Sequence, residues 1–563
     1  MRYLVCAVAL WLAASVCTHA DVLPGLRMDK ESGIDMRVLN LYEDIPPSGF
    51  LPLRVEIRND SPAAHRWLVQ TAQSGAGFGL STRSLNALDV PANSQKTFDL
   101  LVPLAMQSRE AARYSTLMVT VTGFGVSKGL CSAYSSGSGR PPSAYLGMGK
   151  DLSVKNWGPL AQRLEKDTRS LDGTALDADL LPTDWRAVSG FEVIVFTAEE
   201  WQRITPASRN ALLEWTAQGG RLILGFTTTP DGLPPAGPSG TGEIEHWNLA
   251  EEWIERLVQI VSSNATSQAY LASRDYNWNW SLAAQVGRPE APLVMLMVFV
   301  LVFALVVGPV NFIWLAPAGS RHRLFWTTPV ISLGASLLLA GLILTREGFG
   351  GRGLYYVAML SMPSEHKTVR WQEQVSRTGV LSESAFVPSE TSLLLPIRLK
   401  RGTPEPFQRT PDTSYALDGD TWSGDWFRSR STQAQVLTTI VPSRERVEIR
   451  LENGTPQVLS TFPQTLDELF YFDEKGVIWR GRAVAPGRPL ALAITTPEIQ
   501  KAWLERTLLL SGHITRGRVE AFTRHPLAGK FLASSHAIPP VKTLASIRWT
   551  ETGGVLFGEV AKP

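Results

Sequence analysis

The stretch APLVMLMVFVLVFALVVGPVNFIWL, residues 291–315, decides the architecture of this 563-residue chain. It contains no charged residue, and a second uncharged run, residues 324–345, follows the basic triplet Arg321–Arg323. About 20 apolar residues cross a bilayer as a helix, so each run is long enough to span it. The connection at residues 316–323 is too short to hold a domain. The two runs therefore predict a tight transmembrane hairpin, in preference to two buried core helices of a soluble protein.

Two features of the sequence predict the orientation of this hairpin. Arg321 and Arg323 lie in the short connection, and short loops rich in Arg or Lys stay in the cytoplasm. The N-terminus, MRYLVCAVALWLAASVCTHA, has one Arg, an apolar core and a small-residue cleavage site, as a signal peptide of residues 1–20 would have. Cleavage before Asp21 leaves the N-terminus outside the cytoplasm. Both large flanking regions are therefore expected to be extracytoplasmic.

Three residues of the first span predict how the hairpin packs. Gly308 and Pro309 are expected to break the regularity of the helix, because proline removes a backbone donor. The amide of Asn311 is costly against lipid, so we expect it to face the second span. There Ser332 or Thr328 can accept a hydrogen bond.

Aromatic residues flank both ends of the predicted spans, where their amphipathic rings favour the membrane–water interface. Two sets are expected at the interfaces: an inner set of Trp314, Phe325 and Trp326, and an outer set of Tyr276, Trp278 and Trp280.

Composition excludes several classes of function. The net charge is only +2 and charged residues make up 19%, without the concentrated basic face that nucleic-acid binding needs. Removal of residues 1–20 leaves Cys131 as the single cysteine. Neither an intramolecular disulfide nor a cysteine-based zinc site is therefore predicted.

Three regions outside the spans have distinct local patterns. Residues 36–126 alternate in short runs separated by Pro, Asn and Gly turns, which indicates an immunoglobulin-like β-sandwich. Residues 143–270 alternate strands with helices, which indicates an α/β domain with a parallel sheet. Residues 353–563 are rich in strands, with one amphipathic helix at residues 496–512. The predicted fold class is a multidomain α+β membrane protein.

Within the α/β region, the run FEVIVF at 191–196 precedes a helix that ends at Gly219-Gly220, and RLILGF at 221–226 follows. This combination resembles the class I glutamine amidotransferase-like fold, in the degenerate form found in uncharacterised bacterial membrane proteins. Active members place a nucleophilic cysteine on a strand-to-helix elbow. No cysteine follows Cys131 in this chain, so the resemblance does not bring the activity with it.

A wider set of segments resembles one family of signal-bearing, two-pass bacterial envelope proteins. It comprises Gly308-Pro309-Val310-Asn311 in the first span, Trp326 to Pro329 in the second span, and the C-terminal strands. Family members are often encoded near MoxR-type ATPases and von Willebrand A-domain proteins. The resemblance implies the bacterial cytoplasmic (inner) membrane, other envelope proteins as partners, and an accessory role in envelope assembly or stress tolerance. It supplies no catalytic residue and no cofactor.

Short motifs approach a catalytic pattern without completing it. Gly237-Pro238-Ser239 lacks the last glycine of a nucleophile elbow, because Thr241 stands at that position. Gly147-Met148-Gly149 lacks the third glycine of a dinucleotide fingerprint. No two histidines have the helical spacing of metal ligands. We therefore predict no catalytic, cofactor-binding or metal-binding residue.

Three classes of function remain. The favoured class is a non-catalytic, membrane-anchored extracytoplasmic scaffold or partner-binding protein. The alternative is an extracytoplasmic hydrolase, transferase or small-ligand sensor that uses loops 197–205 and 227–246, because open parallel sheets bind ligands beyond the carboxyl ends of their strands. A transporter is less favoured, because the two spans contain no ionisable residue.

Overall fold

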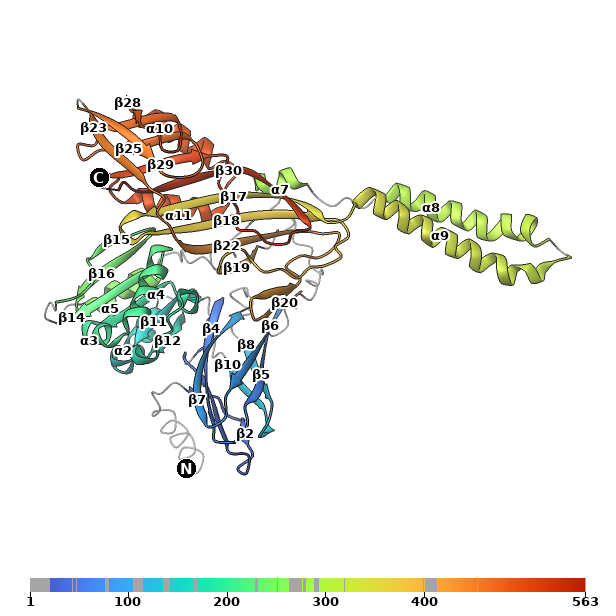
Figure 1. Cartoon of the computed structure of the whole chain (residues 1–563), viewed down its shortest axis with the longest axis horizontal. Coiled ribbons are helices and arrows are strands. Elements are labelled where there is room, and N and C mark those ends of the chain that lie inside the picture. Colours follow the sequence, from blue (N-terminus) through green and yellow to red (C-terminus); the bar gives the residue numbers. More distant parts are fainter. Residues whose placement is uncertain are drawn as a thin grey trace.

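The computed structural model describes residues 21–42, 44–46, 48–75, 80–104, 115–134, 142–166, 170–227, 231–250, 252–262, 276, 280–287, 293–317, 319–397, 399, 413–452 and 454–561. The predicted signal peptide and Trp278 lie outside these described residues. The described chain is mixed α/β and strand-rich, with several sheets and two apolar helices that project from the rest (Figure 1).

The described part of the N-terminal module is built on two large sheets with a common buried core (Figure 1), beside a small two-stranded sheet of β2 (Arg27–Met28) and β9 (Val126–Lys128). The first is a four-stranded sheet of β1 (Asp21–Val22), β3 (Ile34–Asn40), β4 (Gly49–Asn59) and β7 (Ser94–Leu104). The second begins with β10 (Leu130–Tyr134), β8 (Ser115–Thr122), β5 (His65–Gly75) and β6 (Leu80–Val90). Alternate residues of β4, including Leu53, Val55 and Ile57, are fully buried, as a strand with one face on a core requires.

Two strands that come much later in the sequence complete the second sheet. Strand β20 (Thr413–Asp418) pairs in parallel with β6, and β21 (Thr421–Gly424) pairs with β20 at the sheet edge. The N-terminal module therefore extends beyond the predicted range 36–126 on both sides and includes strands that follow the apolar hairpin.

The α/β module has one six-stranded sheet in the order β12-β11-β13-β14-β16-β15. Its parallel strands are β11 (Pro142–Gly149), β12 (Ser170–Leu176), β13 (Val193–Thr197), β14 (Arg221–Phe226) and β16 (Gly242–Asn248). The short β15 (Gly237–Ser239) is antiparallel to β16. The helices are α2 (Lys150–Lys166), α3 (Ala198–Arg203), α4 (Pro206–Ala217) and α5 (Trp253–Ser262).

Both faces of this sheet are covered, as its nearly continuous apolar strands require. Val195 and Ile223 belong to the core with α2 and α5, whereas Phe196 and Leu222 belong to the core with α4. Helix α4 starts after Thr205, whose hydroxyl accepts a hydrogen bond from the backbone N–H of Ser208 at 3.2 Å.

The C-terminal module is built on a nine-stranded sheet in the order β19-β22-β18-β17-β30-β29-β25-β26-β28. Its strands are β17 (Gly351–Met362), β18 (Lys367–Thr378), β19 (Ser392–Ile397), β22 (Thr432–Pro442), β25 (Leu466–Phe472), β26 (Ile478–Val484), β28 (Ala493–Thr495), β29 (Lys530–Ser535) and β30 (Ile547–Glu559). A small sheet of β23 (Val447–Glu452), β24 (Thr455–Ser460) and β27 (Leu490–Ala491) lies beside it.

This module contains one helix more than the sequence predicted. The expected helix at residues 496–512 is shorter, α10 (Pro497–Thr507), and α11 (His513–Arg524) follows it. Gly517 lies in the interior of α11, where glycine costs about 1 kcal/mol relative to alanine. This cost lowers the helix propensity of the segment, so the sequence did not predict α11. Tertiary packing compensates for it, because Ile514, Val519 and Phe522 are buried against the sheet.

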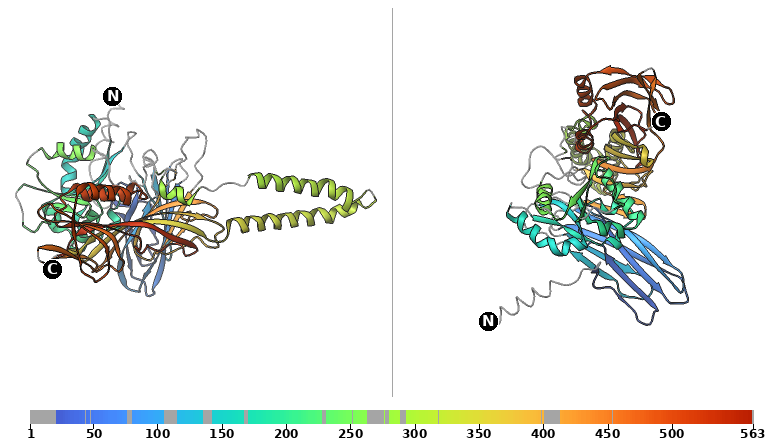
Figure 2. Two further views of the ribbon diagram at one scale, coloured as in Figure 1. Left: turned by 90° about the horizontal axis from the view of Figure 1, so that it is seen from above. Right: turned by 90° about the vertical axis from the view of Figure 1, so that its left-hand side faces the viewer.

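The apolar hairpin extends away from the three modules (Figure 2). Its two arms, Val294–Leu315 and Arg321–Thr345, are long and apolar enough to cross a membrane. The first consists of α8 (Leu293–Leu305) and a π-helical segment (Val306–Leu315), and the second is α9 (Leu324–Glu347). These arms expose most of their apolar side chains, which water does not favour. The structure is therefore compatible with a membrane protein.

The two sets of aromatic residues that were predicted at the membrane interfaces differ in their exposure. Trp314, Phe325 and Trp326 are 80%, 77% and 72% exposed at the far end of the hairpin. The prediction for the outer set is wrong: Tyr276 and Trp280 are buried inside the protein body. Their polar atoms have internal partners, since Tyr276 Oη donates to Glu373 and Trp280 Nε1 donates to the carbonyl of Leu510.

Candidate functional site

The hairpin is held together in its distal half by a polar contact. Pro309 lies in the π-helical segment, where the backbone N–H of Ala316 donates to the carbonyl of Asn311 at 2.9 Å, five residues back. Asn311 is fully buried, and its Nδ2 donates to Thr328 Oγ1 at 3.0 Å, one of the two acceptors named from the sequence. Gly308 has open space around it, because a Cβ added at this position would meet no neighbouring side chain or backbone atom within 4 Å outside its own helix.

The basic residues Arg321 and Arg323 lie at the tip of the hairpin and are exposed. The guanidinium of Arg321 lies over the ring of Phe312, 5.2 Å from its centroid. A cation on an aromatic face at this position suits the membrane–water interface, where both charged and aromatic groups are favoured.

The chain segments before and after the hairpin pack on each other at the base of the hairpin. Arg352 of β17 donates to the carbonyl of Val286, at the end of α7 (Ser281–Val286), at 3.1 Å. Tyr276, before the hairpin, contacts Glu373 of β18, after it. Together with the β6–β20 pairing, these contacts place both flanks on the same side of any membrane that the hairpin crosses.

The usual ligand site of an open parallel sheet is filled by the protein itself. The strand order reverses between β11 and β13, and the crevice beyond the carboxyl ends of such strands is where ligands bind. Glu200 is fully buried there. Its carboxylate accepts from the backbone N–H of Asp151 at 2.8 Å and of Thr197 at 2.9 Å. Burial raises the pKa of Glu200.

The two loops expected to bind a ligand have structural roles in their described parts. The expected loop 197–205 is largely helical, because it contains the whole of α3 (Ala198–Arg203). At the start of this helix Thr197 accepts from the N–H of Glu200, and Glu200 accepts in return. In loop 227–246, where residues 228–230 lie outside the described residues, His246 Nε2 is 3.0 Å from the carbonyl oxygen of Pro234.

Cys131 lies in β10 of the N-terminal module, in register with Val119. The thiol is buried, its Sγ is 3.5 Å from the carbonyl oxygen of Val119, and burial raises the pKa of Cys131 to about 11. A nucleophilic cysteine needs a lowered pKa or an adjacent base, so this environment suits a structural thiol.

The sequence did not reveal one pair of a histidine and an aspartate, because the two residues are far apart in the chain. His536 Nδ1 lies 2.6 Å from Asp467 Oδ2 on the surface of the C-terminal module. Within the described part of the chain, no group of three or more His, Cys, Asp and Glu side chains is arranged to hold a metal ion.

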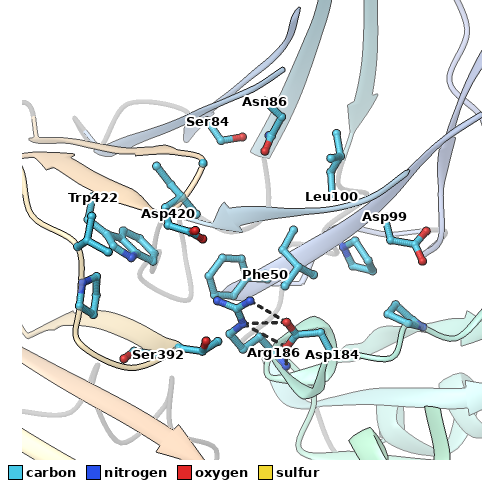
Figure 3. A pocket seen from close by; sticks show the side chains of 18 of the residues that line it. Phe50, Ser84, Asn86, Asp99, Leu100, Asp184, Arg186, Ser392, Asp420 and Trp422 are labelled. Atoms are coloured by element: carbon cyan, nitrogen blue, oxygen red, sulfur yellow. Dashed lines mark hydrogen bonds and ion pairs between the residues drawn. The ribbon is translucent and has the colours of Figure 1, made fainter. Parts of the chain in front are cut away.

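A cleft of about 560 Å³ lies where the three modules meet (Figure 3). The N-terminal module, with its β20–β21 hairpin, contributes Phe50, Pro52, Ser84, Asn86, Asp99, Leu100, Leu101, Leu417, Gly419, Asp420 and Trp422. The α/β module contributes Pro182, Thr183, Asp184 and Arg186, and the C-terminal module contributes residues 387–392. No single module forms this cleft, which explains why the sequence did not reveal it.

Ion pairs fix three of the acidic groups that line the cleft. Asp99 binds Arg54 through two hydrogen bonds of 2.7 and 3.1 Å. Asp184 likewise binds Arg186, with a shortest separation of 2.7 Å, and Glu390 accepts from Arg370 at 2.9 Å. The first two pairs are fork-shaped, which holds both partners in one orientation.

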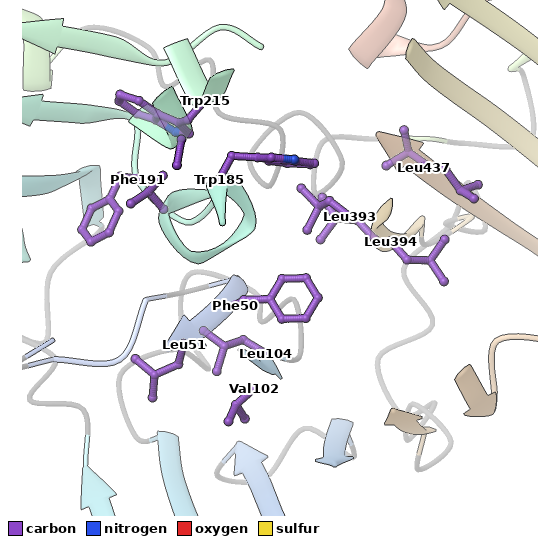
Figure 4. Packing of buried hydrophobic residues seen from close by; sticks show 14 of the residues in the cluster. Phe50, Leu51, Val102, Leu104, Trp185, Phe191, Trp215, Leu393, Leu394 and Leu437 are labelled. Carbon is purple, nitrogen blue, oxygen red and sulfur yellow. The ribbon is translucent and has the colours of Figure 1, made fainter. Parts of the chain in front are cut away.

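Beneath the cleft, buried apolar side chains from all three modules pack together (Figure 4). Phe50 and Leu104 come from the N-terminal module, Trp185 from the α/β module, and Leu393 from the C-terminal module. Tyr42 Oη adds a hydrogen bond of 2.9 Å to the carbonyl of Ala187 across one of these boundaries. The cleft therefore has a closely packed floor.

Comparisons with known proteins give no family: no family model matches the chain, and no curated protein matches it. A calcium-binding mutant of Bacteroides uniformis β-glucuronidase 2 is 10% identical, over 37% of this chain and 24% of that one, with a TM-score of 0.14. The yeast delta-COP-I mu-homology domain, complexed with a Dsl1 peptide, is 7% identical, over 38% and 96%, with a TM-score of 0.17. A Paenibacillus cycloisomaltooligosaccharide glucanotransferase is 8% identical, over 73% and 70%, with a TM-score of 0.16.

The match spans only about a quarter of the glucuronidase chain. At these TM-scores, the likenesses support no statement about the fold or the activity of this protein.

Proposed function

We propose that this protein is a non-catalytic scaffold or partner-binding protein, anchored by its hairpin in the bacterial cytoplasmic membrane with its three modules outside the cytoplasm. The observation that carries the proposal is the pairing of β20 with β6, which joins segments from both sides of the hairpin into one body. A rigid body fixed close to a membrane presents a constant surface to other envelope proteins, for which a MoxR and von Willebrand A-type system is the proposed setting.

Two further observations support a non-catalytic role. The carboxylate of Glu200 occupies the crevice where a substrate of an α/β enzyme would bind. The buried thiol of Cys131, with its raised pKa, lacks the activation that an amidotransferase nucleophile needs.

Cysteine labelling tests the orientation. A bulky, membrane-impermeant maleimide is added to spheroplasts that carry Ser320→Cys at the hairpin tip, or Lys475→Cys in an exposed turn of the C-terminal module. The native Cys131 is buried and gives little background. We expect Lys475→Cys to react in intact spheroplasts and Ser320→Cys only after lysis. The reverse pattern would show the opposite orientation, and reaction of both without lysis would show that the hairpin does not span.

Isolation from native membranes tests the scaffold role. We expect a companion protein to remain bound in a fixed ratio through two purification steps in mild detergent. The absence of any companion, together with turnover of an envelope substrate by the purified protein, would favour the hydrolase or transferase alternative. The sensor version of that alternative is favoured by one observation, the cleft between the modules.

A further inference from the structure

The cleft between the modules has the dimensions of a ligand site. Its volume of about 560 Å³ falls within the range of roughly 300–1,000 Å³ that small-molecule sites occupy. Its walls come from three modules, so a ligand bound there contacts all of them at once. The site lies in the protein body, because none of its lining residues belongs to the hairpin or to the crevice that Glu200 fills.

The charges that line the cleft do not favour an anionic ligand. Arg186, the one Arg or Lys among the lining residues, is bound to Asp184, and Arg54 and Arg370 are bound to the lining carboxylates of Asp99 and Glu390. A phosphate or carboxylate ligand needs an uncommitted Arg or Lys, or a set of free backbone N–H groups. The remaining acidic group, Asp420, adds a negative charge that repels an anion further.

The same charges argue against a polycation. Four carboxylates and three arginines leave a single uncompensated negative charge, that of Asp420, for which the described residues provide no ion pair. One exposed carboxylate in water attracts a cation only weakly.

The polar groups that remain available are of the kind that bind hydroxyl groups. Asn86 offers a planar amide with two donors and an acceptor, and Asp420 offers two acceptors. The hydroxyls of Thr183 and Thr391 are in exposed residues of the wall. In Figure 3, Asn86 and Asp420 lie on the side of the cleft opposite the Asp184–Arg186 pair, so a ligand between them meets polar groups on both sides.

The two aromatic rings that line the cleft do not provide a surface on which a flat aromatic ligand could stack. Phe50 is 1% exposed and Trp422 is 4% exposed. Their rings contact each other edge to face, 6.2 Å apart, and the guanidinium of Arg186 covers the ring of Phe50. The rings therefore serve as the floor of the site.

From these observations we propose that the cleft binds a short, neutral carbohydrate, held by Asn86 and Asp420 and bounded by the Asp184–Arg186 pair. Alternating donors and acceptors suit neighbouring sugar hydroxyls, and the nearly neutral wall does not require a charged substituent on the sugar. The proposal goes beyond the scaffold role and does not depend on the orientation of the membrane hairpin.

Thermal unfolding and calorimetric titration of the full chain test this proposal, in a detergent that has no sugar headgroup. The probes are maltotetraose, cellotetraose and di-N-acetylchitobiose, with spermidine and inorganic phosphate as the charged probes. We expect at least one sugar to raise the unfolding temperature. In Asn86→Ala and in Asp420→Asn, we expect its affinity to fall at least tenfold.

The matched control is Asp231→Asn, which removes an exposed carboxylate from a loop of the α/β module that does not line the cleft. It should leave the sugar affinity unchanged, and all three variants should unfold at the wild-type temperature without sugar. The proposal is wrong if no sugar of the panel binds, if sugar binding survives both cleft substitutions, or if spermidine or phosphate binds at the cleft in place of sugar. None of these outcomes depends on whether a partner protein co-purifies, so this test and that of the scaffold role fail separately.

Discussion

Replacement of Glu373 by glutamine is expected to loosen the junction between the apolar hairpin and the protein body. Glu373 lies in β18 and is fully buried. Its Oε1 accepts from Tyr276 Oη at 2.5 Å and from the N–H of Ile514 at 3.1 Å, and its Oε2 accepts from the N–H of Gly512 at 2.5 Å. The carboxylate thus joins a residue before the hairpin to the first turn of α11, where a negative charge is favoured by the helix dipole.

The expected loss of stability follows from what glutamine can and cannot replace. Its carbonyl oxygen can still accept the bonds from Tyr276 and Ile514. Its amide nitrogen takes the place of Oε2, so two donors face each other at Gly512. Loss of one hydrogen bond to a charged group costs about 1.5–3 kcal/mol, and loss of the charge at the helix terminus costs about 0.3–1 kcal/mol. We therefore expect the free energy of unfolding to fall by about 2–4 kcal/mol.

Urea unfolding of the detergent-solubilised protein, followed by tryptophan fluorescence, measures this change. Hydrogen exchange of residues 513–524 supplies a local readout, because α11 should exchange faster in Glu373→Gln. The control is Asp89→Asn, which removes an exposed partner of Arg66 and should leave the urea midpoint unchanged. If the midpoint and the exchange of α11 are both unchanged in Glu373→Gln, the carboxylate does not hold this junction.

Three further predictions concern other contacts of the fold. Gly219→Ala should lower the free energy of unfolding in urea by about 1–3 kcal/mol, because φ is +111° and the added Cβ would collide with the buried guanidinium of Arg518. In a double-mutant cycle of Asn311→Leu with Thr328→Val, measured by unfolding in mixed micelles, the coupling should be about 0.6 kcal/mol. Burial raises the pKa of Glu200, so the folded state binds this proton more tightly than the unfolded chain. Relative to Glu200→Gln, the wild type should lose stability in urea titrations as pH rises above about 4.5.

Each of these predictions has an outcome that contradicts it. Gly232→Ala has a similar positive φ of +85° but open space around the new Cβ, so equal losses for it and for Gly219→Ala would exclude the collision. Zero coupling in the double-mutant cycle would show that the hydrogen bond between Asn311 and Thr328 does not stabilise the hairpin. A constant difference in stability between wild type and Glu200→Gln across the pH range would show that the carboxylate titrates normally.

The features that the sequence predicted are those determined by local pattern. The apolar hairpin, the buried strands β13 and β14 and the capped helix α4 each depend on residues that are adjacent in the chain. Their patterns of period 2, of period 3.6, or of unbroken hydrophobicity therefore appear directly in the sequence.

The features that the sequence missed depend on contacts between distant residues. Tyr276 has the character of an interfacial aromatic residue, and only the position of Glu373 shows that its hydroxyl is satisfied in the interior. The cleft is equally non-local, since Asn86 and Asp420 come together only after β20 pairs with β6. Neither pairing has a signature within a window of 10 or 20 residues.

The position of the hairpin within the chain has a consequence for how the protein assembles. Until residues 413–424 are available, β6 is an edge strand of the N-terminal sheet, with unpaired backbone groups along Leu80–Leu85. These residues follow both arms of the hairpin in the chain, so they reach β6 only after both arms have been synthesised. The last strand pairing of the N-terminal module thus joins segments more than 300 residues apart, and contacts of such separation form late in folding. Closure of the cleft between the modules, which needs Asp420 beside Asn86, therefore depends on this pairing.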